Sequence, residues 1–454
     1  MSRPARAVGR PPAHAPRSPW YPRGASLLLT CLPLAGPACA SRATAPRAPE
    51  PAPPPASARA EPEPAREDPA RAVRELTFKI MGEVARARRL PATGTLDVAR
   101  VSRPQIRAFV AETLYEHVTP ERFRLLARAD ASLGIIPHDE DPERIVLDLL
   151  ETGVLGFYDP KRETFFVSDF VPSAMLGMVV GHEIVHGLQD MHFDLERLQQ
   201  PIDHDADAES ARTFLIEGDA QAAYFAWMGG EDGLANIQDR VLDVAIDQTL
   251  ELAESHRYPI LARSLQLPYT AGTATLVALA RADGWAAVDA LYQVLPTTTE
   301  QMLHLDKLRA REAAVPVQVA AEPLAAATGL SVVWHDTLGE AALLAMLGQV
   351  HTAPAARRAA AGWGGGRYLV LDDPAHPSPT PLLAGGLAWD TVADAREFEA
   401  AFRTYLDARI GPDRSLLTRS GKLVRFAVRI PAGHAPRDLA RPLARAVTVE
   451  RRKS

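Results

Sequence analysis

The feature that most constrains this sequence is a pair of histidines four residues apart in an apolar run. His182 and His186 enclose Glu183 within residues 175–190. This spacing places both imidazoles on one face of an α-helix, one turn apart, so that they can bind one zinc ion. Glu183 follows the first histidine directly, where it can act as a general base on a water molecule that the metal activates. The segment therefore predicts a helix with a metal site; two ordinary histidines on a half-buried helix are the alternative.

A catalytic zinc ion takes three protein side chains and leaves one position for water, so a third ligand is needed. Glu217 is the favoured candidate, because it lies in a separate helical segment and would complete a His, His, Glu set. His192 stands where a metzincin places its third histidine, but Gln189 occupies the position at which that class has glycine to turn the chain. The sequence also leaves two further carboxylates open as ligands, Glu209 and Asp219.

Cysteine positions and net charge narrow the choices further. Cys31 and Cys39 lie in the first 40 of 454 residues, so the rest of the sequence offers no thiolate ligand and His, Asp or Glu must bind any metal. Lys and Arg number 50 against 56 Asp and Glu, a formal net charge of −6. This charge gives no overall field that attracts nucleic acid, which is therefore not an expected partner.

The first 40 residues have the order of a secretory leader. Arginines precede the apolar run 25–35, small residues follow it, and the run is too short to span a membrane. Two processing routes fit: cleavage after Ala40, or lipidation of Cys39 as in bacterial lipoproteins. Residues 41–70 contain nine prolines and nine alanines and predict an extended linker. We therefore expect an exported protein that is secreted, periplasmic or anchored to the cell envelope through Cys39.

Beyond the linker the sequence predicts an α+β protein. Residues 71–150 form a predicted helical segment, with helix starts at Thr119-Pro-Glu and Asp141-Pro-Glu. A metal-binding core is predicted over residues 151–310 and includes a β-hairpin at 153–167. Strand patterns at 367–371 and 424–430, with a helix at 395–410, predict a small α+β layer over 311–435. Residues 436–454 are basic and predict a solvated tail.

Several segments together resemble a group of exported bacterial and archaeal proteins assigned as zinc metallopeptidases, gluzincin-like and often lipoproteins. The resemblance spans roughly residues 150–430 and rests on these segments: 182–194, 215–220, 268–272, 298–304, 336–340 and 362–368. It implies a zincin-like core, zinc on His182, His186 and Glu217, and Glu183 as the base. The chain departs from the pattern at Leu305, where proline is typical, and at Gly365, where an acidic residue is typical. It also has a longer spacer before Glu217 than thermolysin, so the resemblance is to the broad class.

These observations predict a zinc-dependent metallopeptidase with Zn²⁺ as cofactor and a peptide or protein as substrate. Glu183 would take a proton from the activated water and return it to the leaving amine. His304 is the predicted donor to the developing oxyanion, with Tyr269 and Tyr258 as alternatives. The edge of the hairpin at 153–167 offers a place for an extended peptide.

Two other functions fit the same residues. One is a zinc-binding envelope scaffold without catalysis, and the other is a metal-dependent hydrolase of a non-peptide bond. The intact Glu183 argues against the scaffold. The substrate sequence and the oligomeric state are left open.

Overall fold

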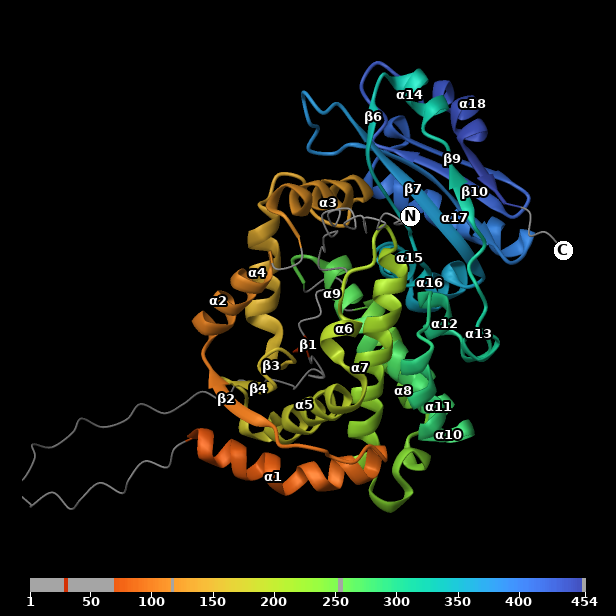
Figure 1. Cartoon of the computed structure of the whole chain (residues 1–454). Coiled ribbons are helices and arrows are strands. Elements are labelled where there is room, and N and C mark those ends of the chain that lie inside the picture. The colour runs from red at the N-terminus through yellow and green to blue at the C-terminus, as the bar shows by residue number, and fades with distance from the viewer. Residues whose placement is uncertain (1–27, 32–68, 116–117, 252–255, 451–454) are drawn as a thin grey trace, which may run out of the picture.

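The computed structural model describes residues 28–31, 69–115, 118–251 and 256–450 (Figure 1). The predicted leader and linker lie outside these residues, apart from Leu28–Cys31 and the two residues that begin the first helix, so the predictions for Cys39 stay open. A mainly helical N-terminal region with a small sheet precedes a C-terminal region built on an antiparallel sheet. The α+β class is therefore confirmed. The C-terminal region, cyan to blue, lies above the helical region in Figure 1.

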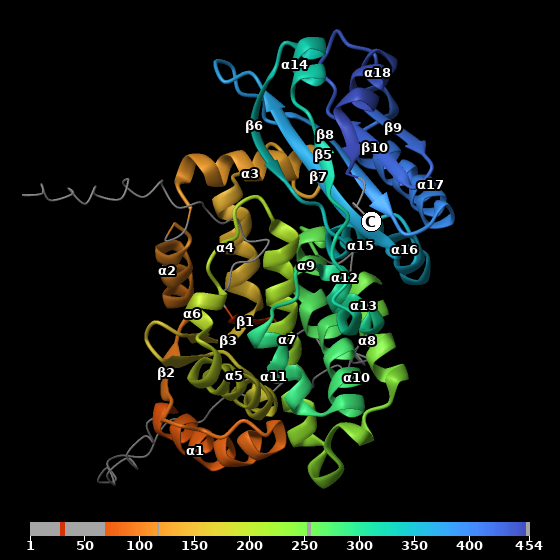
Figure 2. The ribbon, with the colours of Figure 1, turned by 45° about the vertical axis from the view of Figure 1, so that its right-hand side comes forward.

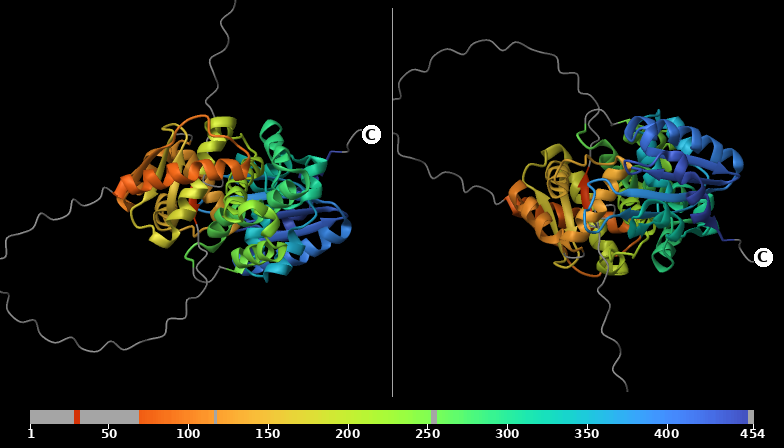
Figure 3. Two further views of the ribbon diagram at one scale, coloured as in Figure 1. Left: turned by 90° about the horizontal axis from the view of Figure 1, so that it is seen from below. Right: turned by 90° about the horizontal axis from the view of Figure 1, so that it is seen from above.

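Helices dominate the N-terminal region, and α1 lies across its lower surface (Figures 1 and 3). None of the helices in the described ranges has the length and apolar character needed to cross a membrane. In chain order the helices are α1 (Pro69–Arg88), α2 (Arg103–Thr113), α3 (Pro120–Leu133), α4 (Pro142–Gly153), α5 (Ser173–Phe193), α6 (Leu195–Leu198), α7 (Ala206–Met228), the 3-10 helix η1 (Gly230–Asn236), α8 (Asp239–Glu251), α9 (Pro259–Leu267), the π-helix η3 (Pro268–Gly272), α10 (Thr273–Asp283), α11 (Trp285–Gln293), α12 (Thr299–Leu303) and α13 (Leu305–Ala310).

The two helix starts marked by proline are confirmed. The Thr119 side chain accepts a hydrogen bond from the backbone N–H of Arg122 at the start of α3. Asp141 accepts from the N–H of Glu143 in the same way at the start of α4. Each cap satisfies a backbone donor that has no partner within the helix, while proline at the next position needs none.

The small sheet has the strand order β1-β3-β4-β2. Its strands are β1 (Leu28–Cys31), β2 (Asp97–Val101), β3 (Val154–Asp159) and β4 (Thr164–Ser168). The antiparallel pair β3 and β4 confirms the predicted hairpin. The parallel strand β2 was not expected in the helical segment, because five residues are too few to reveal a period. Strand β1, from the apolar run of the predicted leader, pairs antiparallel with β3.

The C-terminal region is a five-stranded antiparallel sheet in the order β6-β7-β8-β10-β9, with a separate two-stranded pair of β11 and β5. The helices α14 and α18 contact each other and lie together at the top of this region in Figure 2. The elements are β5 (Val317–Val319), α14 (Glu322–Thr328), β6 (Ser331–Asp336), α15 (Glu340–Leu347), α16 (Ala353–Ala360), β7 (Trp363–Asp372), β8 (Leu382–Trp389), α17 (Val392–Arg409), the 3-10 helix η4 (Pro412–Arg414), β9 (Ser415–Ser420), β10 (Leu423–Val428), α18 (Pro436–Ala446) and β11 (Val447–Val449).

The expected solvated tail at 436–454 differs from the structure over residues 436–449, which form α18 and β11. Leu439, Leu443 and Val447 are fully buried and share a core cluster with Leu423 of β10. Leu439 and Leu443, four residues apart, give α18 one apolar face that Val447 continues at the start of β11, whereas Arg441 and Arg445 are exposed. The prediction of a tail relied on the number of basic residues and overlooked this spacing. The α+β layer therefore extends beyond the predicted boundary at 435.

Buried carboxyl groups lie where the two regions meet. Asp207, near the start of α7, accepts hydrogen bonds from the N–H and hydroxyl of Thr299 at 3.2 and 2.5 Å. The Thr299 hydroxyl in turn accepts the N–H of Ala341 in α15 at 3.0 Å. Burial raises the pKa of Asp207 to about 7 despite these hydrogen bonds. Burial also raises the pKa of Glu300 to about 7, although Lys307 lies 2.6 Å away and lowers it in part.

These shifts predict a pH dependence of stability. Between its ordinary pKa near 4 and about 7, Asp207 binds more protons folded than unfolded, so the free energy of unfolding falls as pH rises through this range. Asp207→Asn removes this contribution. The difference in melting temperature, variant minus parent, should therefore be more positive at pH 7.5 than at pH 5. A difference in melting temperature that is the same at both pH values would contradict the prediction.

Candidate metal centre

Helices α5 and α7 pack side by side and bring His182, His186 and Glu217 into one buried group. The two histidine Nε2 atoms are 3.0 Å apart, and each lies 3.3 Å from Glu217 Oε2. Donor atoms held at about 2.0–2.1 Å by one tetrahedral zinc ion lie about 3.3 Å from one another. The spacing of the three atoms therefore fits a single metal ion of this size. The histidines are 0% exposed and Glu217 is 3% exposed.

A polar network behind the group orients His186. Its Nδ1 lies 2.8 Å from Gln189 Oε1, so Nδ1 carries the proton and Nε2 is free to bind a metal. The Gln189 amide nitrogen lies 2.9 Å from both Asp219 and the Tyr292 hydroxyl, and the latter donates to Asp219 at 2.9 Å. Asp219 forms a fully buried ion pair with Arg88 of α1 at 2.6 Å. Gln189 lies on α5 with His186, whereas Asp219, Tyr292 and Arg88 come from α7, α11 and α1, so spacing along the sequence does not predict this network.

Electrostatic effects in the group run in opposite directions. Burial would raise the pKa of Glu217, but His186 and His182 lower it to about 2, so this carboxylate is charged. Burial lowers the pKa of His182, which favours the neutral imidazole that binds metals. Burial, and then the charge of Glu217, raise the pKa of Glu183 well above its ordinary value. A neutral His182 imidazole beside an ionised Glu217 carboxylate is a donor set that suits a divalent cation.

Tyr269 lies beside this group on the π-helix η3. Its ring centroid is 5.6 Å from that of His182. Helix α7 approaches η3 closely because Gly218 and Gly272 have no side chain: an added Cβ would lie 2.7 Å from Gly272 C in the first case and 2.8 Å from Phe214 O in the second. Short π-helical turns occur often at functional sites. Of the three predicted oxyanion donors, Tyr269 is the one with a ring contact to His182.

The remaining candidates lie elsewhere. His192 donates from Nε2 to the carbonyl of Pro91 at 2.7 Å, and α5 continues through Gln189 without the turn that a metzincin requires. Glu209 accepts the N–H of Ile202. His304 lies 2.8 Å from Glu340; burial alone would lower the pKa of His304, but Glu340 raises it. The hydroxyl of Tyr258 donates to Glu140 at 2.6 Å.

A second acidic group, Glu300, Glu312 and Asp390, already surrounds a cation. The Lys307 ammonium lies 2.6 Å from Glu300 and 3.0 Å from Glu312, and it also pairs with Asp390. Because Lys307 provides the positive charge, this group has no need of a metal ion.

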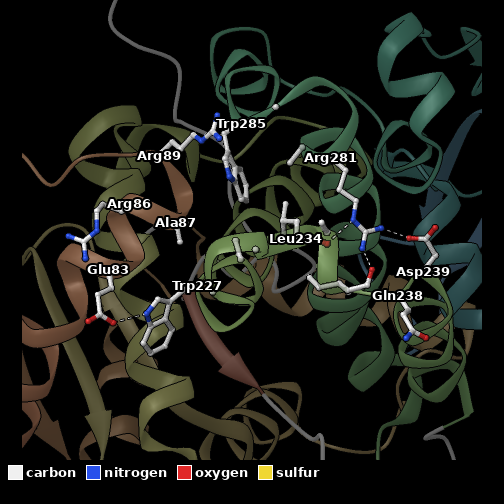
Figure 4. Close-up of a pocket in the computed structure, with 17 residues that line it drawn as sticks. Glu83, Arg86, Ala87, Arg89, Trp227, Leu234, Gln238, Asp239, Arg281 and Trp285 are labelled. Atoms are coloured by element: carbon white, nitrogen blue, oxygen red, sulfur yellow. Dashed lines mark hydrogen bonds and ion pairs between the residues drawn. The ribbon is translucent and has the colours of Figure 1, made fainter.

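A cavity of about 1030 Å³ lies between the end of α1, η1 and the start of α11. Figure 4 shows Glu83 with Trp227 on one side of it, where the indole N–H donates to the carboxylate at 3.1 Å, and the pair Arg281 and Asp239 on the other. None of the three potential metal ligands lines this cavity.

The fold and this site define an α+β protein with a buried His-His-Glu group that could hold a metal. Among known families, one described as "Domain of unknown function (DUF8575)" matches residues 330–449. This stretch begins after the His-His-Glu group and covers most of the C-terminal sheet region. No curated protein and no solved structure matches the chain.

Replacement of single side chains tests the group directly. Glu217→Ala removes one of three converging donors and should lower metal affinity by more than the roughly 10–100-fold that loss of an outer hydrogen-bond partner costs. His192→Ala is the matched control, because this histidine contacts the Pro91 carbonyl, and it should retain the parent's metal content. Elemental analysis of the purified variants gives the answer. The reverse ranking would move the third ligand to His192.

Proposed function

We propose that the protein is a zinc-dependent peptidase. The position of Glu183 supports this proposal most strongly. Glu183 follows His182 on α5 and is 0% exposed, and the negative charge of Glu217 helps to raise its pKa. A carboxyl group with a raised pKa can both accept a proton and return it. Two imidazoles and one carboxylate are the ligand set of many catalytic zinc sites, which is the reason to propose zinc.

In the proposed mechanism the metal ligands, Glu183 and Gln189 each have a separate role. His182, His186 and Glu217 would hold the zinc ion, whose chemistry would be to polarise the scissile carbonyl and to lower the pKa of a water molecule. Glu183 would accept a proton from the water that attacks the carbonyl carbon, and would then deliver this proton to the departing amine nitrogen. Gln189 holds the ring of His186 in the tautomer that presents Nε2 to the metal.

We propose Tyr269 as the donor that stabilises the negative charge on the carbonyl oxygen. Its ring contact with His182 supports this choice over His304, whose Nε2 lies beside Glu340. A donor fixed in place before the reaction stabilises the transition state without a cost of reorganisation.

The small sheet offers a place for the substrate. Strand β3 lies against α5, where a Cβ added to Gly156 would be 2.7 Å from Val179 Cγ1. In this structure β1 occupies the edge of β3 and also contacts α5. We propose that removal of the leader on export frees this edge, so that an extended peptide can pair with β3 next to the metal helix.

The Glu183→Gln variant tests the catalytic role of this residue. The amide cannot act as a base, so turnover should fall by at least about 10² to 10⁴, while zinc content stays as in the parent. The measurement is cleavage of a peptide library by the purified protein, read by mass spectrometry, together with zinc analysis. Parent-like activity in Glu183→Gln would exclude the mechanism. A zinc-loaded parent that cleaves no peptide would favour the scaffold.

Tyr269→Phe tests the oxyanion donor. Loss of one such donor usually costs about 10² to 10³ in kcat, with KM and zinc content little changed. Tyr258→Phe is the matched control, because it removes a hydroxyl that donates to Glu140, and its kcat should equal that of the parent. If the two variants have the same kcat, Tyr269 has no special role.

A further inference from the structure

We propose that a pocket between the two regions binds the terminal carboxylate of a peptide through Arg367. The pocket has a volume of about 370 Å³ and is lined by the start of α7, the residues before α12, residues 314–319 around β5, and parts of β6 and β7. None of the potential metal ligands lines it. Pockets for small ligands span about 300–1000 Å³ and favour domain junctions, so the size and position suit a short chain end.

Arg367 provides the positive charge. It lies half-buried on β7, where Nη1 donates to the carbonyl of His204 at 2.9 Å and lies 3.3 Å from His335 Nδ1. Within the described ranges it forms no ion pair with a carboxylate. A guanidinium has five N–H donors, so these contacts fix the head group and leave donors on the other nitrogens. The arrangement is a cation held in place that lacks an anion.

Residues 314–319 form another wall of the pocket and contact the backbone of β7 closely. The N–H of Val315 donates to the carbonyl of Gly364 at 2.6 Å, and a Cβ added to Gly365 would lie 2.2 Å from the Val315 carbonyl oxygen. Gly366 also packs closely against the backbone, since an added Cβ would lie 2.6 Å from the carbonyl oxygen of Leu338. The contacts of Val315 with Gly364 and Gly365 hold the segment 314–319 directly on β7. The pocket is therefore formed before any ligand arrives.

Two carboxylates in the lining select the kind of anion. Asp205 accepts hydrogen bonds from the Thr337 hydroxyl at 2.9 Å and from the N–H of Ala208 at 3.2 Å, and Asp207 accepts from Thr299. Their partners lie within the protein. The charge of Asp205 disfavours a multiply charged anion such as phosphate, and Asp207 adds to this repulsion above its pKa of about 7. A singly charged carboxylate meets Arg367 with less repulsion and can accept two parallel N–H donors.

The main chain of the wall favours a peptide as the bearer of this carboxylate. Five consecutive residues, Val315 to Val319, line the pocket, and among the described strands β5 pairs only with β11. An extended peptide can pair with the main chain at a strand edge of this kind while its terminal group reaches a cation. The proposal does not depend on the metal or on catalysis.

The test is binding of a fluorescein-labelled six-residue Ala/Gly peptide with a free C-terminal carboxylate, followed by fluorescence anisotropy. The full chain carries Glu183→Gln, so that cleavage cannot remove the probe. The peptide with an amidated C-terminus should bind at least about tenfold more weakly than the free acid. Inorganic phosphate should compete poorly. Equal affinity for acid and amide, no binding of the acid, or competition by phosphate as strong as by the free-acid peptide would each overturn the proposal.

Variants locate the site. Arg367→Met should weaken binding of the free-acid peptide at least about tenfold and abolish the preference over the amide. Arg367→Lys keeps the positive charge but loses the paired N–H donors, so its affinity for the free-acid peptide should lie between those of the parent and Arg367→Met. Arg358→Met is the control, since this exposed arginine lies on α16 beside Glu397, and it should bind like the parent. Thermal unfolding checks that each variant is folded. Unchanged binding in folded Arg367→Met, or an equal loss in Arg358→Met, would overturn the proposal.

Discussion

Three electron-rich atoms meet in the interior between α5 and α7, and the surrounding structure is arranged around this contact. The Nε2 atoms of His182 and His186 and a carboxylate oxygen of Glu217 lie within 3.3 Å of one another, away from water. Such atoms repel unless a proton or a metal cation lies among them, and burial removes the water that would otherwise screen them. A bound cation would turn this repulsion into attraction and would link the two helices.

Contacts outside the group connect it to several helices. Gln189 connects His186 to Asp219, and the buried pair of Asp219 and Arg88 ties α7 to α1. Breaking a buried pair by removing one partner leaves an uncompensated charge and is strongly destabilising. Arg88 also stacks over Trp285, 4.5 Å from the ring centroid, which brings α11 into the same support. The metal-facing nitrogen of His186 is thus held by contacts that reach across several helices.

Local spacing in the sequence was enough to predict the helix of His182 and His186, the proline-marked helix starts and the hairpin, because each depends on neighbours a few residues apart. The need for a third ligand, together with the resemblance to the gluzincin-like group, pointed to Glu217, which the structure brings to both histidines. The three-residue spacing of His186 and Gln189 on α5 permits their contact but did not single it out, whereas the position of Tyr269 beside His182 depends on how separate helices pack. The close approach of α7 and η3 at Gly218 and Gly272 could not be predicted either, because it does not depend on a repeated spacing of residues. In α18 the arginines outnumber the leucines, so the basic composition concealed the four-residue spacing of the buried Leu439 and Leu443.

We propose that His182, His186 and Glu217 bind one zinc ion. X-ray absorption at the zinc edge of the purified full-length protein tests this directly. We expect one zinc per chain with four nitrogen or oxygen neighbours at about 2.0–2.2 Å, two of them imidazoles. The Glu217→Ala protein should lose this signal. A chain that takes up no zinc, or whose zinc keeps the same environment after Glu217→Ala, would show that these three residues do not form the zinc site.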